Sequence, residues 1–357
     1  MKIFSIVGTR PNFIKAFPLI YELQKISNHK IIHTGQHYDK TLSNIFFDEL
    51  DIKKPDYVIN LKSKKKTINQ IPEMITKLNI ILTNDLPDAV VVYGDTSSSL
   101  AGALVANKCN IPIIHIESGL RSYDKSMPEE VNRIIIDNIS KILICPTKTA
   151  KKNLEKENIK KNIFVYGDTN LEAIKKISVN LIKYKNLLSK LNLTKKNYIF
   201  LTLHRDFNSD NKKFLIRLFK AINKIKYKFI WPLHPRTQKN LKQFKLEIPR
   251  NIRIIPPVSF FECIFLQKNS KILITDSGGL QKEAFFLEIP CVTLRPSTEW
   301  IETLKNKNNI LAHKSSKTIE SAIRHQLKKK FEIKNKNFFG KGEISKKIAK
   351  SIINKII

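Results

Sequence analysis

Short apolar runs alternate with amphipathic segments along most of the chain. The apolar runs are rich in Val and Ile, which is typical of strands buried in a parallel sheet. The segments between them place apolar residues three or four positions apart, as an amphipathic helix does. In the first half the predicted strands are Ile3–Val7, Lys30–Thr34, Ala89–Tyr93, Ile113–Ile116, Lys141–Cys145 and Ile163–Tyr166, and helices such as Phe13–Gln24 and Leu100–Ala106 lie between them.

The second half repeats this rhythm. Its predicted strands are Tyr198–Leu203, Phe229–Leu233, Ile252–Ile255, Lys271–Thr275 and Cys291–Leu294. The stretch Lys175–Asn197 is predicted to be helical and to begin the second half, and Glu343–Ile357 is predicted to be a final helix. Strands that alternate with helices predict right-handed βαβ units, and hence an α/β fold with a parallel sheet in each half.

Length and composition favour an ordered protein of two domains. The 357 residues are too many for one ordinary domain, and the hydrophobic fraction of 42% excludes wholesale disorder. No apolar run approaches the roughly 20 residues of a membrane span, and Met1–Val7 is too short for the apolar region of a signal peptide. The cysteines Cys109, Cys145, Cys263 and Cys291 lie far apart. We therefore expect a reduced, cytoplasmic protein with no metal, no cofactor and no membrane span.

The charge balance is strongly basic. Lys and Arg number 64 against 31 Asp and Glu, which leaves a formal net charge of +33. Such a balance fits either a polyanionic partner or lysines spread over every solvated helix face. The lysines extend from Lys2 to Lys355 in short runs, without any nucleic-acid-binding motif. We therefore expect no specific nucleic-acid partner, although a basic surface attracts a small diphosphate.

Carboxylates follow the strands of the first half. In open α/β sheets ligands bind beyond the carboxyl ends of the strands, so the polar residues at these ends are informative. Asp95 follows one strand, Glu117 follows the next, and Glu129 begins a predicted helix. Asp95 would also serve as an ordinary helix N-cap, whereas Glu117 has no helix to cap. Crowded carboxylates have pKa values that are pushed apart, which acid–base catalysis uses.

Cations and histidines complete the set of strand-end residues. Arg10 and Lys15 follow the first strand, where they fit a bound anion or simply an exposed basic surface. His204 and His234 each follow a strand of the second half, and each has an Arg close by. Two equivalent histidines at one sheet edge favour anion binding or proton transfer over a purely structural role.

The segment Ile274–Ala284 carries the strongest local signal. A strand leads into Ser277, Gly278 and Gly279 and then into a helix, so backbone N–H groups and the helix dipole point at one spot. Glu283, one turn later, could reach a ribose. The segment is not a P-loop, and no GxGxxG follows the first strand, which disfavours ATPases and dinucleotide dehydrogenases. The two sets of residues, facing each other across an interdomain cleft, predict acid–base chemistry on a nucleotide-diphosphate-linked substrate.

Taken together, the motifs resemble the non-hydrolysing UDP-N-acetylglucosamine 2-epimerase family. The motifs, in order, are GTRPNFIK, TGQHYD, VYGDTSSSLAG, HIESGLRS, MPEEVNR, LHR, HPRT, TDSGGLQKEA and CVTLRPSTEW. The resemblance implies two Rossmann-like, doubly wound domains of the glycosyltransferase-B type, with the active site in the interdomain cleft. It places the N-terminal domain at residues 1–168, completed by a helix at 343–357, and the UDP-binding domain at 169–342. It also implies a homodimer.

The resemblance further implies an isomerase that inverts C2 of a UDP-2-acetamido sugar by eliminating UDP and adding it back, in the supply of sugars for surface polysaccharides. Asp95, Glu117 and Glu129 would be the acid–base set, and His204 would assist the leaving diphosphate. The implied substrate-binding residues are Arg10, Lys15, Arg205, His234, Ser277, Gly278 and Gly279 around the phosphates, Glu283 at the ribose, the segment from Val258 to Cys263 at the uracil, and Trp300 near the sugar.

Several motifs depart from the usual family pattern. Trp300 stands where TERPE has an arginine, and Phe13 and Met127 also differ. These variants resemble the branch that acts on UDP-2,3-diacetamido-2,3-dideoxy-glucuronate, so both this sugar and UDP-N-acetylglucosamine stay open as substrates. Gln36 and His37 match part of a site for activating substrate, but Asp39 departs from it. We therefore do not predict this activation.

Three other classes of protein stay open on the sequence alone. A glycosyltransferase of the same fold would share the phosphate-binding turn but does not need three carboxylates at the other sheet. A hydrolysing epimerase would release free N-acetylmannosamine and UDP. A non-catalytic nucleotide-sugar binder would keep the phosphate-binding turn and show no exchange at C2.

Overall fold

The computed structural model describes residues 1–36, 53–62, 67–332 and 337–356. It divides into two compact units, of which unit 1 comprises Met1–Ala173 and Asn335–Ile357, and unit 2 comprises Ile174–Lys334. The boundary between the units therefore follows Ala173, within a helix, and not residue 168.

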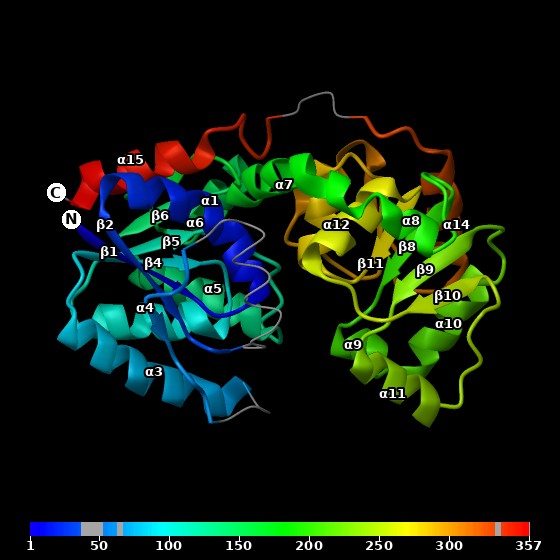
Figure 1. Cartoon of the computed structure of the whole chain (residues 1–357), viewed down its shortest axis with the longest axis horizontal. Coiled ribbons are helices and arrows are strands. Elements are labelled where there is room, and N and C mark those ends of the chain that lie inside the picture. Colours follow the sequence, from blue (N-terminus) through cyan, green and yellow to red (C-terminus); the bar gives the residue numbers. More distant parts are fainter. Residues whose placement is uncertain (37–52, 63–66, 333–336, 357) are drawn as a thin grey trace. The chain divides into compact units, whose positions relative to one another are not determined.

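Unit 1 is built on a parallel sheet with the strand order β3-β2-β1-β4-β5-β6-β7 (Figure 1). Its strands are β1 (Lys2–Val7), β2 (Asn28–His33), β3 (Tyr57–Val58), β4 (Ala89–Tyr93), β5 (Ile113–Ile116), β6 (Ile142–Cys145) and β7 (Ile163–Val165). The helices that begin in unit 1 are α1 (Arg10–Ile26), α3 (Thr67–Asn84), α4 (Ser97–Lys108), α5 (Pro128–Ile139), α6 (Lys148–Lys156), α7 (Thr169–Asn180) and α15 (Ile344–Ile356).

The end of the chain returns to unit 1. Helix α15 packs against α1, and the two lie side by side in Figure 1. The backbone N–H of Asp168 donates to the carbonyl of Phe339 at 2.9 Å, and the N–H of Ser345 donates to the Glu172 carboxylate at 2.9 Å. These bonds attach the C-terminal segment of unit 1 to the end of its N-terminal segment.

Unit 2 has a second parallel sheet, with the strand order β10-β9-β8-β11-β12-β13. Its strands are β8 (Tyr198–Thr202), β9 (Lys228–Pro232), β10 (Ile252–Ile255), β11 (Ile272–Thr275), β12 (Cys291–Thr293) and β13 (Asn309–Leu311). Its helices are η1 (Leu181–Tyr184), α8 (Asn186–Lys190), α9 (Asp206–Ser209), α10 (Lys212–Ile222), α11 (Pro235–Gln243), α12 (Phe260–Asn269), α13 (Gly278–Phe286), η2 (Ile301–Lys307) and α14 (Ser316–Lys328).

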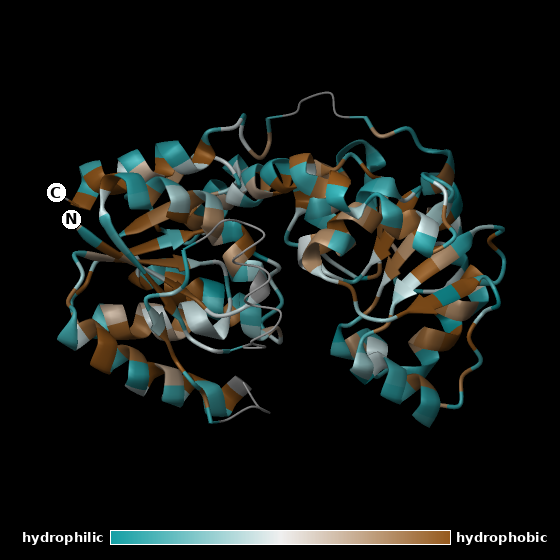
Figure 2. Ribbon diagram, in the orientation of Figure 1, coloured by the Kyte–Doolittle hydropathy of each residue, from teal (hydrophilic) through white to brown (hydrophobic). Residues whose placement is uncertain are grey.

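The apolar strands explain why each sheet is covered on both faces. Every residue of β4 is buried, and the strands are the most hydrophobic elements in Figure 2. In unit 1, helices α3, α4 and α5 cover one face of the sheet, and α1 and α15 cover the other (Figure 1). Within the described ranges, every helix is too short or too polar to span a lipid bilayer. The prediction of two doubly wound parallel α/β domains is thus confirmed.

The strand order reverses direction once in each sheet. In unit 1 this happens between β1 and β4, and in unit 2 between β8 and β11. In doubly wound folds the connections leave on opposite sides at such a point and open a space for ligands beyond the strand ends. The residues that follow β1, β4, β8 and β11 are therefore the ones to inspect.

Candidate active site

A tight turn after β4 brings Lys15 and Glu117 together in unit 1. Gly94 has a φ of +63°, and its N–H donates to the carbonyl of Ile116 at the end of β5, at 2.8 Å. A Cβ on Gly94 would lie 2.7 Å from Nζ of Lys15 and 3.3 Å from Oε1 of Glu117. The ion pair between Lys15 and Glu117 therefore lies directly against this turn.

Glu117 is held in an unusual backbone conformation. Its φ is +71°, in the left-handed region that non-glycine residues seldom adopt, and its side chain is only 6% exposed. The N–H groups of Glu117 and Ser118 both donate to the carbonyl of Ile144, at 3.1 Å. Backbone strain of this kind costs about 1–3 kcal/mol and clusters at functional sites. The conformation agrees with the candidate role that the sequence suggests for Glu117.

Helix α5 holds the second carboxylate. The guanidinium of Arg133 forms an ion pair with the Asp95 carboxylate, and the side-chain amide of Asn132 donates to the Asp95 carbonyl at 2.8 Å. Arg133 also pairs with Glu130 at 2.8 Å. Glu129, the third carboxylate, is half-buried in the first turn of α5. Helix α5 thus carries Glu129 and also the groups that orient Asp95.

Two predictions in unit 1 concern side chains that the structure does not describe. Arg10 begins α1, but its side chain is outside the described part of the chain. His37 and Asp39, which were considered with Gln36 for a site that binds activating substrate, also lie outside the described residues. Gln36 is described, and its side-chain oxygen accepts from the hydroxyl of Ser98 at 2.7 Å.

In unit 2, Asp276 organises the turns after β8 and β11. Its carboxylate is fully buried and accepts from the backbone N–H groups of His204 at 3.1 Å and Arg205 at 3.0 Å. The hydroxyls of Thr202 and Thr275, the last residues of β8 and β11, lie 2.7 Å apart. Asp276 therefore places His204 and Arg205 beside the beginning of α13.

The beginning of α13 has the geometry of a phosphate-binding turn. Ser277 is the N-cap, and its Oγ accepts from the N–H of Leu280 at 3.3 Å. Gly278 and Gly279 follow as the first helical residues, whose N–H groups have no partner within the helix. A Cβ on Gly278 would lie 2.4 Å from the carboxylate of Glu299. Only glycine fits there without displacing Glu299.

The two histidines differ in their surroundings. His204 places Nδ1 3.3 Å from Asp276 Oδ1. Removal of the ring from water lowers the pKa of His204, and the charge of Asp276 partly opposes this. Because 43% of the side chain is exposed, we expect only a small shift. His234 is the exposed N-cap of α11, and its Nδ1 accepts from the N–H of Arg236 at 3.3 Å.

Glu283 and Trp300 are both buried near α13. Glu283 is 6% exposed in the second turn of the helix, and Trp300 is 3% exposed. The Nζ of Lys282, which is itself 1% exposed, lies 3.9 Å from the centre of the Trp300 ring, a cation–π contact. Trp300 is therefore in contact with a buried cation at the position where the usual family motif has an arginine.

Val258 and Cys263 flank the first turn of α12. Ser259 and Glu262 form a capping box there, which makes Val258 the residue before the cap and Cys263 the fourth helical residue. Apolar residues at these two positions commonly pack together and fix the start of a helix. Both side chains pack against the apolar cluster around Tyr198. Their packing explains the residue types without a ligand.

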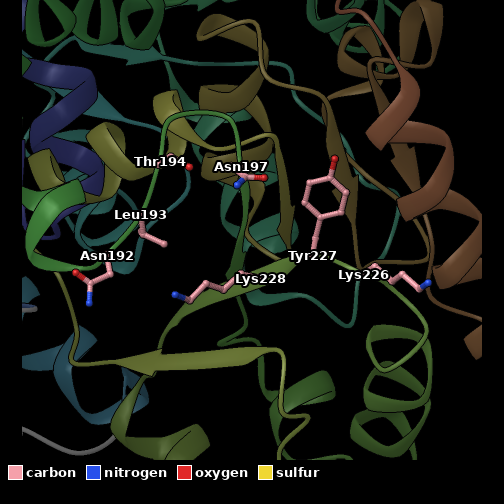
Figure 3. Close-up of a pocket in the computed structure, with 7 residues that line it drawn as sticks. All are labelled: Asn192, Leu193, Thr194, Asn197, Lys226, Tyr227 and Lys228. Atoms are coloured by element: carbon pink, nitrogen blue, oxygen red, sulfur yellow. The ribbon is translucent and has the colours of Figure 1, made fainter.

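A cavity of about 570 Å³ in unit 2 lies elsewhere (Figure 3). It is lined by Asn192, Leu193, Thr194, Asn197, Lys226, Tyr227 and Lys228. Asn197 precedes β8 and Lys228 begins β9, so this cavity is at the amino ends of the strands. The candidate residues lie at the carboxyl ends, and the cavity is therefore not part of the candidate site.

Sequence reasoning missed two residues that organise the site. Arg133 lies in the motif MPEEVNR, which by itself assigns it no role, although it follows Glu129 by four positions, which places both on one side of a helix. Asp276 lies in the phosphate-binding segment, where the sequence gives it no separate role. A carboxylate directly at the end of a buried strand was the available signal, the same one that singled out Glu117.

Comparison with known proteins identifies the family. The model of the family described as UDP-N-acetylglucosamine 2-epimerase matches residues 21–353. A Methanococcus maripaludis protein named UDP-N-acetylglucosamine 2-epimerase homolog is 44% identical, covering 99% of this chain and all of its own. A Pseudomonas aeruginosa UDP-2,3-diacetamido-2,3-dideoxy-D-glucuronate 2-epimerase is 39% identical, with 98% of each chain covered.

A solved structure agrees with both the fold and the family. The Methanocaldococcus jannaschii UDP-GlcNAc 2-epimerase, crystallised with UDP-GlcNAc and UDP, superposes with a TM-score of 0.91 at 40% identity. The match covers 99% of this chain and 100% of that one, so it extends through both units. The resemblance seen in the motifs is therefore confirmed: the chain belongs to the UDP-N-acetylglucosamine 2-epimerase family of isomerases.

Proposed function

We propose that this protein inverts C2 of a UDP-2-acetamido sugar without hydrolysing it. UDP is eliminated together with the C2 proton to give an enzyme-bound glycal, and UDP then adds back as a proton returns to the opposite face. The observation that carries the proposal is the pair of carboxylates at neighbouring strand ends of unit 1. Asp95 and Glu117 are each paired with a cation, Arg133 and Lys15 respectively.

The carboxylates suit removal and return of a C2 proton. A C2–H bond is a weak acid, so its removal needs an ionised base that is held in place. A cation beside a carboxylate favours the ionised form. Asp95, Glu117 and Glu129 together supply the base for one face of the sugar and the acid for the other. The backbone at Gly94 and at Glu117, with a positive φ at both residues, sets the direction in which these groups leave the strands.

Unit 2 supplies the groups that retain UDP. The turn of Ser277, Gly278 and Gly279 binds the diphosphate, with the N–H groups of the two glycines as donors, and His204 assists the departure of the phosphate oxygen. Arg205 and His234 add donors, and Glu283 binds the ribose. Retention of UDP is essential to this mechanism because the same molecule must add back to the glycal. A site that released UDP would hydrolyse the substrate instead.

Both candidate sugars carry the 2-acetamido group and the C2–H that this mechanism requires. The relatives named above include enzymes named for each of them. The two sugars differ at C3 and C5, where the uronate carries a second acetamido group and a carboxylate. The expectations of a homodimer and of a cytoplasmic location remain predictions.

Proton NMR in D2O tests the proposal directly. UDP-N-acetylglucosamine and the diacetamido uronate are incubated separately with the purified protein. We expect deuterium at C2 of one sugar, a signal of its C2 epimer, and no net loss of UDP-sugar. Release of UDP without an acceptor would indicate hydrolysis, and release only with an acceptor would indicate a glycosyltransferase. No exchange with either sugar would disprove the proposed function.

A variant separates catalysis from binding. Glu117→Gln keeps the size of the side chain but removes the ionised carboxylate, so we expect exchange to fall about 10²–10⁴-fold. UDP affinity, measured by calorimetry, should stay close to that of the wild type because most of the groups assigned to the diphosphate belong to unit 2. Ser277→Ala is the complementary variant, and its main expected effect is a lower affinity for UDP. If Glu117→Gln retained full exchange, another residue would be the base.

A further inference from the structure

We propose that His115 is a positioning residue, a buried and doubly protonated imidazolium that ties together the turns carrying Asp95 and Glu117. His115 lies on β5, between β4 and β6, and is fully buried. The importance of the two turns rests on the proposed function. The charge of the ring does not, and the two can be tested separately.

Both ring nitrogens of His115 face hydrogen-bond acceptors. Nδ1 is 2.7 Å from the Asp137 carboxylate, and Nε2 is 2.9 Å from the carbonyl oxygen of Gly94. An ionised carboxylate and a backbone carbonyl have no proton to give. A neutral imidazole donates from one nitrogen only, so it can satisfy one of these groups and must turn a lone pair toward the other. Only the imidazolium makes both bonds.

The other contacts of Asp137 favour an ionised carboxylate. Its second oxygen accepts from the guanidinium of Arg121 at 2.7 Å and from the N–H of Gly119 at 3.1 Å. Burial acts to raise the pKa of Asp137, but the charges and hydrogen bonds of His115 and Arg121 outweigh it, and the pKa lies below its ordinary value. The proton between His115 and Asp137 therefore belongs to the ring.

Arg121 links Asp137 to a second carboxylate at the surface. Arg121 also donates two bonds to Glu157, at 2.7 and 2.6 Å, so the cluster contains two carboxylates and one guanidinium besides the imidazole. Glu157 is exposed, so water screens its charge, and the hydrogen-bond geometry of the ring carries the assignment rather than a count of charges. Beyond Gly94, Lys15 and Glu117 form their own neutral pair.

The neighbouring charged groups on α5 are paired with groups other than His115. On that helix, Arg133 faces the carboxylates of Glu130 and Asp95 rather than His115. Glu130 also accepts from the N–H groups of Ser122 and Tyr123, at 2.9 Å each. These charges are therefore paired away from His115 and leave the contacts of its two nitrogens unchanged.

This arrangement connects the two turns through one ring. The bond from Nε2 holds the carbonyl of Gly94, next to Asp95 in the chain. The bond from Nδ1 holds Asp137, which in turn holds Gly119 and Arg121 in the turn that begins at Glu117. Loss of the ring proton would turn one attraction into a repulsion between lone pairs. Either the Gly94 turn or the Asp137 contact would then shift.

A small shift of these turns would move the proposed base and acid relative to the sugar and lower the rate of exchange. A displacement of about 1 Å at a reacting group can cost about 10²-fold in rate. The base and the acid must reach opposite faces of one carbon, so their relative position matters more than that of either group alone. His115 acts on this relative position without itself touching the substrate.

Nitrogen-15 NMR of the wild-type protein tests the charge state. The protein is labelled with ¹⁵N-histidine, and the His115 ring is assigned from the signal that disappears in His115→Gln. We expect both His115 nitrogens to carry protons at about pH 8, where an ordinary histidine is neutral. A ring with one bare nitrogen at that pH would overturn the proposal. The charge state itself is read from the wild-type spectrum, and the measurement needs no activity.

The Asp137→Asn variant tests the positioning role. Its amide oxygen can still accept from Arg121 and Gly119, while its NH2 group faces Nδ1, so His115 should become a neutral ring that donates only to Gly94. We expect the doubly protonated signal to disappear and kcat for exchange to fall about 10–100-fold, with little change in UDP affinity. Unchanged kcat, or a ring that stays doubly protonated, would contradict the proposal.

Asp85→Asn is the matched control. Asp85 also belongs to unit 1 and pairs with Lys2 and Lys30, at 2.7 and 2.6 Å, but it precedes β4 at the amino ends of the strands. Loss of its charge should destabilise the unit without changing the His115 spectrum or kcat. If the wild type showed the doubly protonated ring but no exchange with any UDP-sugar, the proposed function would fail and the charge assignment would stand.

Discussion

At the residue scale, the proposed chemistry rests on single residues at the strand ends and on their surroundings. Glu117 could be selected from the sequence because a carboxylate directly after a buried strand has no helix to cap. The structure adds its left-handed backbone and its pairing with Lys15. The sequence does not single out His115, because there it is only a polar residue within an apolar run. Its proposed role follows from the contacts of its two ring nitrogens in the structure.

Another buried histidine makes the stability of the protein depend on pH. His29 is 5% exposed on β2, and burial lowers its pKa from 6.5 to about 4. Between these values the unfolded chain binds a proton that the folded chain does not, so stability falls as the pH falls. We expect a loss of about 2 kcal/mol between about pH 7 and pH 5 from this residue.

Urea unfolding at the two pH values measures this effect. The variant His29→Asn should show a smaller difference between the two urea midpoints than the wild type. The control His325→Asn, at an exposed position of α14, should behave like the wild type. An unchanged pH dependence in His29→Asn would mean that other groups are responsible.

At the scale of elements, the regular strands were predictable and their short outer neighbours were not. Ala89–Tyr93 and Ile113–Ile116 coincide with β4 and β5, since a strand buried on both faces must be apolar throughout. Tyr57–Val58 and Asn309–Leu311 were missed. Both lie at the sheet edges, where short, half-exposed strands carry little apolar signal. The stretch expected to be helical from Lys175 includes the end of α7, η1 and α8.

The turn between β5 and α5 depends on a glycine that contacts another element. Gly119 has a φ of +77°, and a Cβ there would lie 2.3 Å from the carbonyl oxygen of Ala150. Gly342 also has a positive φ, +107°, but a Cβ there would meet nothing within 4 Å. An alanine in such a backbone conformation costs about 1–2 kcal/mol by itself. Gly119→Ala should cost clearly more, because α6 or the turn must also move.

Thermal unfolding and exchange kinetics of the two variants measure the difference. We expect Gly119→Ala to lower the melting temperature by several degrees more than Gly342→Ala, and to reduce kcat because its turn carries Glu117. Gly342→Ala should keep normal kcat. Equal effects of the two substitutions would show that the contact with α6 is unimportant.

For the whole molecule, the net charge of +33 acts on the substrate rather than on the fold. A basic protein concentrates diphosphates near its surface, and salt screens this attraction over about 10 Å at 0.1 M and about 3 Å at 1 M. We expect the affinity for UDP to fall steeply as the salt concentration rises. Uridine, which has no charge, is the control, and its affinity should change little. Titration calorimetry with both ligands measures the two slopes, and equal slopes would contradict the electrostatic account.

The sequence by itself determined the α/β fold, the family and most of the candidate residues. It could do so because burial within a parallel sheet dictates apolar strands, and because functional groups follow those strands directly. Only the tertiary structure decided which groups meet. Lys15 is 102 positions from Glu117, and Arg133 is 38 positions from Asp95. No local pattern specifies such pairs, because packing of distant segments brings them into contact, and the same holds for the link that His115 makes between two strands and α5.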